Sequence, residues 1–435
     1  MNFQRLLMQS LLWRGFYFFT LLMVNVFLSR YLQAAGSGWV YYLSNIFSFS
    51  IIIVGICLEA GITYFASGKI IHSNRLLWFS LVASAAVSLI VLGGIYVYLL
   101  FEQDTTVPPA QFYYFGICYI TGLFLTNCVT ALFYAQNNFV LPNLILTVLN
   151  IALVIFIPKG VIANDLTQAG ILLDIYFLFF LLQGVFLWLA YFFKNKSWMT
   201  ISIPNSKHLG SLFRYSLVAM IANVIFFLVY RIDYLFVHSS PVCTEADLGN
   251  YIQVSKLGQM LLIVPQIIAS VIFPRTASGI ERKELNNSIM IIARLFSQLY
   301  LFIFLVILFF GTQFFTGLFG HTFDRMKLPF LILIPGIFSL SVLSLLSAYF
   351  SGKDKLRVNL TGALLALIFV IAGDYLFVPT YGILAAAAVS TIGYTINVGY
   401  ALFIFYKDYS INLVDFFGWR RSDYAWLKTL LVTKP

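Results

Sequence analysis

Residues 11–30, LLWRGFYFFTLLMVNVFLSR, decide the fold of this chain. A helix of this length rises about 30 Å, which matches the hydrocarbon thickness of a bilayer. Two arginines, Arg14 and Arg30, lie inside this apolar stretch or at its edge, and a similar pair, Arg214 and Arg231, recurs about two hundred residues later. Inserting a charge into such a segment costs about 2.5 to 3.5 kcal/mol, so a recurring pair indicates a partner or a task.

The composition extends this pattern to the whole chain. Of 435 residues, 61% are hydrophobic and 10% are charged, and the mean hydropathy of +0.92 lies far outside the range of soluble domains. The apolar runs are long enough for helices and too long for barrel strands. We therefore expect an all-α polytopic membrane protein with twelve spans. The predicted spans are 6–33, 38–66, 75–101, 110–135, 140–158, 168–193, 209–238, 250–274, 286–316, 327–350, 356–378 and 382–406.

Lysine and arginine gather in every second connection and in the tail. The opposite loops carry only Lys159, Arg325 and Lys327. By the positive-inside rule, both termini are predicted to be cytoplasmic. The net charge of +10 reflects this bias and suits anionic lipid head groups, so it requires no nucleic acid.

The second half of the sequence echoes the first. Residues 134–144, YAQNNFVLPNL, correspond to residues 350–360, FSGKDKLRVNL, at an offset of 216, and FASG at 65–68 corresponds to TASG at 276–279. Six spans followed by six similar ones indicate a parallel repeat. The predicted parts are an N-lobe at 1–193, a cytoplasmic linker at 194–208, a C-lobe at 209–406 and a cytoplasmic amphipathic tail at 407–435.

An ordered set of motifs runs through about 400 residues. SLLWRG at 10–15 opens the first span, and it is followed by LSRYL at 28–32, Gly38 and Tyr41. The later motifs are YRID at 230–233, GNY at 249–251, FPR at 273–275, LFG at 318–320, GK at 352–353 and PTYG at 379–382. This set resembles the polysaccharide biosynthesis proteins, the lipid-linked oligosaccharide flippases of the multidrug, oligosaccharidyl-lipid and polysaccharide exporter superfamily.

The resemblance implies two six-helix lobes around a central cavity, lined by the first and seventh spans, that opens alternately to either side of a bacterial inner membrane. It also implies a cargo, a polyprenyl pyrophosphate-linked oligosaccharide, whose pyrophosphate suits a cationic cavity. The expected partners are this glycan lipid, the bilayer and polysaccharide-assembly enzymes, and the chain is expected to be a monomer. A lipid-linked peptidoglycan precursor flippase and an ion-coupled multidrug exporter of the same fold remain alternatives.

In the first half, Arg14 lies about 12 Å inside the inner edge of its span. Asn25 is eleven positions further, so it shares a helix face with Arg14. Glu59 lies at a comparable depth on the second span, and an ion pair between Glu59 and Arg14 is the alternative to a substrate role for this arginine.

In the second half, the position aligned with Glu59 is Ser270, so Arg214 has no such partner and is the stronger candidate. Arg231 lies near an outer end, where it could snorkel to head groups. Asp233 cannot face Arg231 at a spacing of two and could pair with Lys256 instead. The predicted substrate-binding residues are Arg14, Asn25, Arg214, Arg231, Lys256 and Arg294. Of these, Arg14 and Arg214, with Lys256 or Arg294, are expected to bind the diphosphate, although Arg294 could equally be an inner-end anchor.

Ion coupling would require carboxylates within the spans. Asp174 and Asp374 are the intramembrane or near-edge candidates, each of which could relay a proton or sodium ion or simply cap a helix end in water. With Glu59 and Asp233 they form the set of coupling or charge-partner candidates. No cofactor is predicted beyond a coupling ion, H⁺ or Na⁺.

Enzymatic and metal sites have no support in the sequence. There is no zinc-protease, nucleophile-elbow or phosphate-loop motif, and the histidines are scattered through loops. The four cysteines have no paired or metal-ligand spacing. We therefore expect a transporter rather than an enzyme, with a tail from Lys407 onward that lies on the inner leaflet or binds assembly enzymes.

Overall fold

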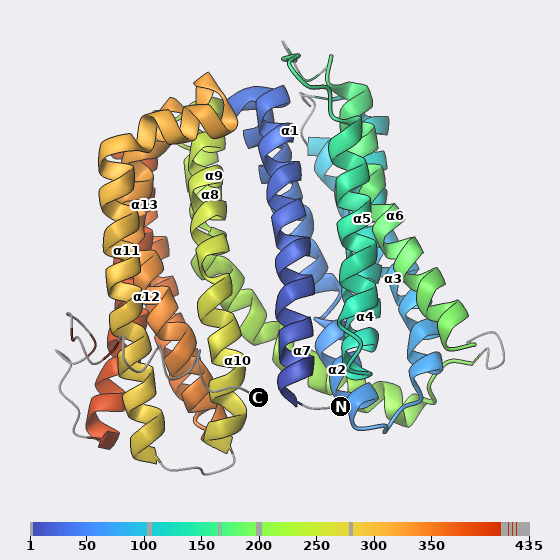
Figure 1. The fold of residues 1–435 in the computed structure, drawn as a ribbon. Coiled ribbons are helices and arrows are strands. Elements are labelled where there is room, and N and C mark those ends of the chain that lie inside the picture. The colour runs from blue at the N-terminus through green and yellow to red at the C-terminus, as the bar shows by residue number, and fades with distance from the viewer. Residues whose placement is uncertain are drawn as a thin grey trace. The chain divides into compact units, whose positions relative to one another are not determined.

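The computed structural model describes residues 3–101, 107–163, 166, 168–196, 202–277, 282–409, 416, 420 and 423. The chain forms two compact units, unit 1 at Met1–Phe227 and unit 2 at Leu228–Pro435. The regular structure in the described residues is entirely helical, as predicted. In Figure 1, long helices run side by side within each unit.

Unit 1 contains the first six helices and most of the seventh. Their bounds are α1 Phe3–Val54, α2 Leu58–Ser67, α3 Ser73–Phe101, α4 Pro109–Ala135, α5 Val140–Phe156, α6 Gly170–Lys194 and α7 Ser206–Arg231. Unit 2 contains the end of α7 and the later elements. These are α8 Asp233–His238, α9 Glu245–Leu261, α10 Ile263–Ala277, α11 Arg282–Phe319, the 3₁₀ helix η2 His321–Met326, α12 Lys327–Gly352 and α13 Leu356–Tyr409.

Helix α1 turns back on itself at Gln33, whose φ of 59° and ψ of −176° break the helical path. The Tyr41 hydroxyl, on the second arm, lies 3.3 Å from the carbonyl of Asn25 and 3.3 Å from Ser29 Oγ on the first. In a straight helix, residues 25 and 41 would be about 24 Å apart. These contacts therefore require two antiparallel arms, each as long as a predicted span.

Helix α13 makes a corresponding turn at Gly382, where φ is 58°. Small residues allow its arms to approach closely. A Cβ added at Gly373 would lie 2.8 Å from Val389, and one added at Gly362 would lie 2.5 Å from Asn397. Glycine at such positions is the usual means by which helices approach closely in a membrane.

Nine helical segments in the described part of the chain are long and apolar enough to cross a membrane. Two of them, from α1 and α13, are long enough to cross twice once their turns are counted. The predicted domain boundary in the 194–208 linker remains a prediction. The division between the compact units lies later, within α7, because the first part of α7 packs on α2 through Ser216 and Gly61.

The central helix of each unit is α4 in unit 1 and α12 in unit 2. In the spans that contain α4 and α12, 72% of an 18-residue apolar stretch is buried, a larger share than in any other span of the described residues. On α4, a Cβ added at Gly122 would lie 2.2 Å from the backbone of Phe180 in α6, and on α12 one at Gly336 would lie 2.8 Å from Thr391 in the second arm of α13. The fourth and tenth predicted spans thus have similar positions in their units.

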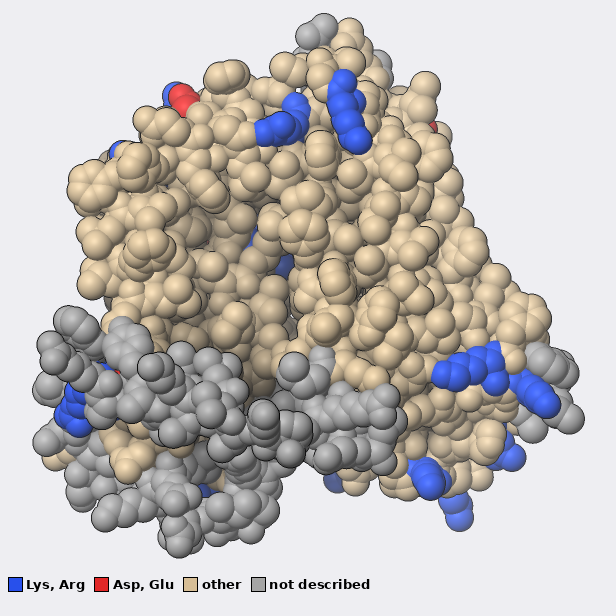
Figure 2. Space-filling model, in the orientation of Figure 1, with Lys and Arg blue, Asp and Glu red and all other residues tan. Residues whose placement is uncertain are grey.

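The outer faces of the helices are apolar. Exposed side chains such as Leu89, Ile155, Ile171, Val218 and Phe309 are suited to lipid rather than water. On the face drawn in Figure 2, uncharged residues cover most of the surface and acidic residues are sparse. Charge inside the spans is therefore confined to a few side chains, and these define the candidate sites.

Candidate functional site

In unit 1, Arg14 stacks on aromatic rings. Its guanidinium carbon lies 4.5 Å from the centroid of Tyr134 and 5.7 Å from that of Phe139. The Tyr134 hydroxyl lies 3.1 Å from Asn143 Nδ2, which fixes the ring against α5. The predicted alternative partner, Glu59, forms no ion pair with Arg14 among the described residues. The charge of Arg14 is thus balanced by ring faces and leaves its donors available.

A neutral network lies deeper in unit 1. Asn150 on α5 donates from Nδ2 to Thr20 Oγ1 on α1 at 3.2 Å, and Gln183 on α6 donates from Nε2 to Asn150 Oδ1 at 2.9 Å. Asn143 and Asn150 are seven residues apart and so share one helix face. None of Thr20, Asn150 and Gln183 is among the site residues predicted from the sequence. The signal was a polar stripe, Asn143, Thr147 and Asn150, in an otherwise apolar helix.

The remaining predicted residues of unit 1 have separate surroundings. Asn25 is buried against the second arm of α1, where its carbonyl accepts the Tyr41 hydrogen bond. Asp174, in the first turns of α6, accepts a hydrogen bond of 2.9 Å from Gln111 Nε2, as a residue near a helix end does. Asp174 is therefore held within its own unit by α4.

Arg214 is exposed on α7, about twelve ångströms along the helix from its start. Its neighbour Tyr215 stacks on Tyr64 with ring centroids 4.6 Å apart, and Ser216 faces Gly61. These contacts fix that part of α7 on α2. No carboxylate lies within ion-pair distance of Arg214 in the described part of the chain.

In unit 2, two buried carboxylates lie close together. Asp233, 1% exposed, accepts hydrogen bonds from the Tyr251 hydroxyl, from Ser390 Oγ at 3.0 Å and from the Tyr234 amide. Asp374 is fully buried, and neither of its carboxylate oxygens has a hydrogen-bond partner among the described residues. The two carboxylates are near enough for their charges to interact.

The fold explains how this cluster forms. Asp374 and Ser390 lie on the two arms of α13, which the turn at Gly382 brings together, and α8 and α9 supply Asp233 and Tyr251. Carboxylate and hydroxyl oxygens are the ligands that hard cations prefer. A buried carboxylate with no donor is costly unless a proton or a cation compensates it.

Basic residues lie on the elements around this cluster. Arg231 donates from Nη2 to Gln259 Oε1 at 3.1 Å, and Lys256 is half-buried on α9. The charges of Arg231 and Lys256 interact with each other. The partners of Asp233 that the structure shows are hydroxyls and a backbone amide, whereas its predicted pairing with Lys256 remains a prediction.

Arg294 has a different place from the one expected for a diphosphate ligand. It is 4% exposed and binds Asp423 through two contacts, Nε to Oδ2 at 2.8 Å and Nη2 to Oδ1 at 2.7 Å. The Arg294 guanidinium lowers the pKa of the Asp423 carboxyl. Phe416 packs on Phe405 nearby. Arg294 thus binds Asp423 of the tail, whereas its predicted roles as a diphosphate ligand or an inner-end anchor remain predictions. Most of residues 407–435 lie outside the described residues.

Within the described residues, no group of three or more His, Cys, Asp or Glu side chains could hold a metal ion. The four cysteines are free, and three of them are buried. The arrangement therefore offers two kinds of chemistry. Unit 1 has the stacked Arg14 and a network of neutral amides, and unit 2 has the buried carboxylates Asp233 and Asp374 with Arg231 and Lys256 on neighbouring elements.

No protein-family model matches the sequence, and no curated protein matches it either. The fold does match solved structures. An inward-facing multidrug resistance MATE family transporter of the MOP superfamily has a TM-score of 0.70 at 14% identity, over 92% of this chain and 94% of that one. The lipid II flippase MurJ, in an inward closed conformation, has a TM-score of 0.68 at 14% identity, over 93% and 89%.

A third structure is a MOP superfamily transporter from Pyrococcus furiosus, described by the reverse polarity of its binding pocket. Its TM-score is 0.61 at 14% identity, over 93% of this chain and 95% of that one. These structural neighbours are transporters and not enzymes. The chain is therefore a multi-pass membrane protein with the fold of the MOP-superfamily transporters.

Proposed function

We propose that this protein is a flippase that moves a polyprenyl pyrophosphate-linked oligosaccharide from the inner to the outer leaflet by alternating access. The observation that carries the proposal is Arg14, which is held on the Tyr134 ring with no carboxylate partner in the described part of unit 1. A guanidinium in this state retains donors for a diphosphate. Arg214 supplies a second cation without a carboxylate partner.

Twelve spans agree with this function. The nine long segments give twelve if α1 and α13 each cross twice and the shorter apolar α5 crosses once. The proposed lobes are 1–193 and 209–406, with both termini in the cytoplasm of a bacterial inner membrane. An even number of spans per lobe lets the fourth and tenth spans occupy corresponding places in a parallel repeat.

The polarity of the site distinguishes this proposal from drug export. A pump for organic cations needs carboxylates where its cargo binds, whereas the carboxylates described in unit 1 are only Glu59 and the hydrogen-bonded Asp174. The Pyrococcus furiosus transporter, with its reversed pocket polarity, supports the view that one fold can serve cargoes of different charge.

In this proposal, the residues that couple transport to a proton or sodium gradient lie in unit 2. Asp233 and Asp374 bind a proton or a sodium ion, because their oxygens are buried and Asp374 lacks donors in the described structure. Release of that cation on the other side of the membrane would reset the transporter.

The test is a vesicle assay of glycan-lipid flipping with purified protein. Arg14→Gln and Arg214→Gln should each slow flipping about tenfold, the effect of removing one charge-assisted contact. Arg30→Gln, on the same arm of α1 as Arg14 but exposed near the turn at Gln33, is the matched control and should retain the wild-type rate.

Wild-type flipping by both variants at normal expression would overturn the proposal. Transport of organic cations that survives the arginine substitutions would instead indicate a multidrug exporter. Faster flipping of a lipid-linked peptidoglycan precursor than of oligosaccharide lipids would indicate the other flippase class.

A further inference from the structure

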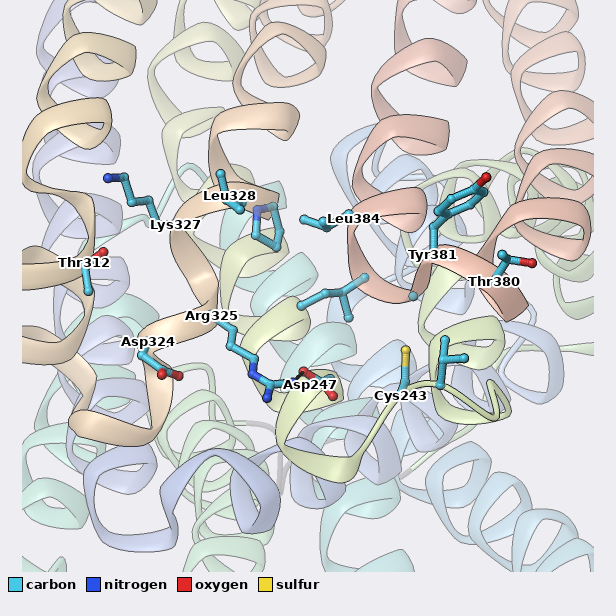
Figure 3. A pocket seen from close by; sticks show the side chains of 14 residues that line it. Cys243, Asp247, Thr312, Asp324, Arg325, Lys327, Leu328, Thr380, Tyr381 and Leu384 are labelled. Atoms are coloured by element: carbon cyan, nitrogen blue, oxygen red, sulfur yellow. Dashed lines mark hydrogen bonds and ion pairs between the residues drawn. The ribbon is translucent and has the colours of Figure 1, made fainter.

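A cavity of about 680 Å³ lies at one end of unit 2, away from the carboxylate cluster. Its walls come from the α8–α9 loop, the start of α9, α11, the η2–α12 junction and the turn of α13 (Figure 3). The charge distribution predicts that this end faces the outer leaflet. The cavity does not include any residue of the proposed cargo or coupling sites.

The wall formed by the α13 turn is closely fitted. A Cβ added at Gly382 would lie 3.1 Å from Cys243 Sγ, and the positive φ of 58° at this residue disfavours side chains as well. Ser240 Oγ donates to the Val378 carbonyl at 3.1 Å, which satisfies an acceptor near the break in the helix. The loop and the turn thus form one wall.

Two of the four charges in the cavity neutralise each other. Arg325 Nη1 lies 2.7 Å from Asp247 Oδ1, and the other oxygen of Asp247 accepts a hydrogen bond of 2.7 Å from Thr244 Oγ1. The other two charges are Lys327 and Asp324. They line the same cavity, and neither forms an ion pair with the other or with any residue that the structure describes, although the charge of Asp324 also interacts with that of the paired Arg325.

Lys327 is positioned by its aliphatic stem. A Cβ added at Gly311 would lie 3.0 Å from Lys327 Cγ, so the absence of a side chain at Gly311 makes room for this stem on α11. In Figure 3 the lysine extends toward the α11 side of the cavity, on which Thr312 lies. Lys327 and Asp324 therefore offer a positive and a negative site within one cavity.

The remaining walls are suited to an acyl chain. Leu328, Tyr381 and Leu384 line the cavity and are 58%, 66% and 39% exposed. Tyr375, Leu376 and Phe377, which precede the turn on α13, are also exposed. Aromatic and apolar side chains of this kind are typical of a membrane interface.

We propose that this cavity binds a phospholipid with a phosphoethanolamine head group, with its phosphate at Lys327, its ammonium at Asp324 and an acyl chain against Leu328 and Leu384. A zwitterion offers a partner to both Lys327 and Asp324, whereas an anionic phosphoglycerol lipid offers Asp324 no ion-pair partner. A phosphocholine lipid has no ammonium hydrogen to donate to Asp324. The proposal does not depend on which cargo the protein moves.

The test is native mass spectrometry of the intact protein with an equimolar mixture of phosphoethanolamine, phosphoglycerol and phosphocholine lipids that have identical acyl chains. The wild type should retain the phosphoethanolamine lipid about tenfold more than either other lipid. Asp324→Asn should reduce that preference to about one, and Lys327→Gln should reduce retention of all three phosphates. Asp354→Asn and Lys355→Gln, exposed in the α12–α13 connection, are matched controls that should retain the wild-type pattern.

Equal retention of the three lipids by the wild type, or no retention at all, would overturn the proposal. So would a stronger preference for the anionic lipid, or an equal loss of selectivity in the control variants. The ratio of lipids is measured within one sample, so a variant that folds in lower yield still gives a decisive result.

Discussion

The polar groups buried in the two units differ in charge. Unit 1 joins Thr20, Asn150 and Gln183 by hydrogen bonds between neutral groups, whereas unit 2 brings Asp233 and Asp374 together. The arginines of the two units differ as well. Arg14 in unit 1 stacks on aromatic rings, whereas Arg294 in unit 2 binds the Asp423 carboxylate. The hydrogen bonds of the neutral network are satisfied, whereas Asp374 has no hydrogen-bond partner among the described residues.

This difference suggests a division of roles within one fold. A satisfied neutral network stabilises the contacts of α1, α5 and α6, and in the proposed function Arg14 remains available for cargo. In the same proposal, a cation that binds Asp374 removes the cost of burying this carboxylate, and its binding favours one arrangement of unit 2 over another.

Replacement of Arg294 by leucine should have the largest effect. It leaves the buried Asp423 carboxylate without its partner, and loss of one member of a buried pair costs about 3 to 5 kcal/mol. The tail should therefore detach, which limited proteolysis of the tail would detect. Exposed Arg357→Leu is the matched control. A tail as resistant as in the wild type would contradict this view of Arg294.

The same ion pair predicts a pH dependence. Because Arg294 lowers the pKa of Asp423 in the folded state, the stabilisation is complete above the unfolded pKa of about 3.9. It should be lost as the pH falls below that value and through the lower folded pKa. Tail protection should therefore be unchanged between pH 7 and pH 5 and fall below about pH 4, and a loss already at pH 6 would contradict it.

Asp374→Asn should slow ion-coupled transport by about 10- to 100-fold, the effect of losing a charged ligand. In the absence of transported ions it should raise the free energy of unfolding by about 1 kcal/mol or more, because an uncompensated buried charge is removed. Transport under imposed sodium and proton gradients and thermal unfolding are the two measurements. A variant that is both less stable and fully coupled would contradict the role of Asp374.

The reciprocal substitution, Asn150→Asp, places a carboxylate in the neutral network of unit 1. It should destabilise the protein by about 1 to 3 kcal/mol at neutral pH without creating a new ion dependence. Thr20→Val, which removes the acceptor of Asn150 Nδ2 and the hydrogen bond from Thr20 Oγ1 to the Tyr17 carbonyl, should cost about 1 kcal/mol. If transport by Asn150→Asp gained a new dependence on sodium or protons, a carboxylate in unit 1 could also couple transport to an ion, which would contradict the difference between the two units.

The smallest expected effect concerns Tyr134. Tyr134→Leu removes the ring below Arg14 and should weaken diphosphate binding two- to fivefold, since a cation–π contact contributes about 0.5 to 1 kcal/mol. Tyr134→Phe retains the ring and is the matched control. Isothermal titration calorimetry with a soluble diphosphate would measure the affinity of each variant. Equal affinities of the two variants would show that the Tyr134 ring does not contribute to diphosphate binding.

The helical membrane fold was predictable because apolar length and polar spacing are local properties. The predicted spans at 110–135 and 168–193 lie close to α4 at Pro109–Ala135 and α6 at Gly170–Lys194. The partners of the charged residues were harder to predict. An ion pair between Glu59 and Arg14 was plausible from depth alone, but depth does not specify rotation about the helix axis, and Arg14 instead faces Tyr134.

By itself, the sequence determined a chain of apolar helices with arginines and carboxylates at defined depths, because each of these depends on neighbouring residues. The tertiary structure alone decided that Asp423 binds Arg294, 129 positions earlier, and that Ser390 binds Asp233, 157 positions earlier. The turns at Gln33 and Gly382 lie where predicted spans end and begin, at 33–38 and 378–382, whereas the packing of the two arms of each helix depends on the tertiary structure. Contacts between distant residues depend on how helices rotate and approach, and no local pattern in the sequence records that choice.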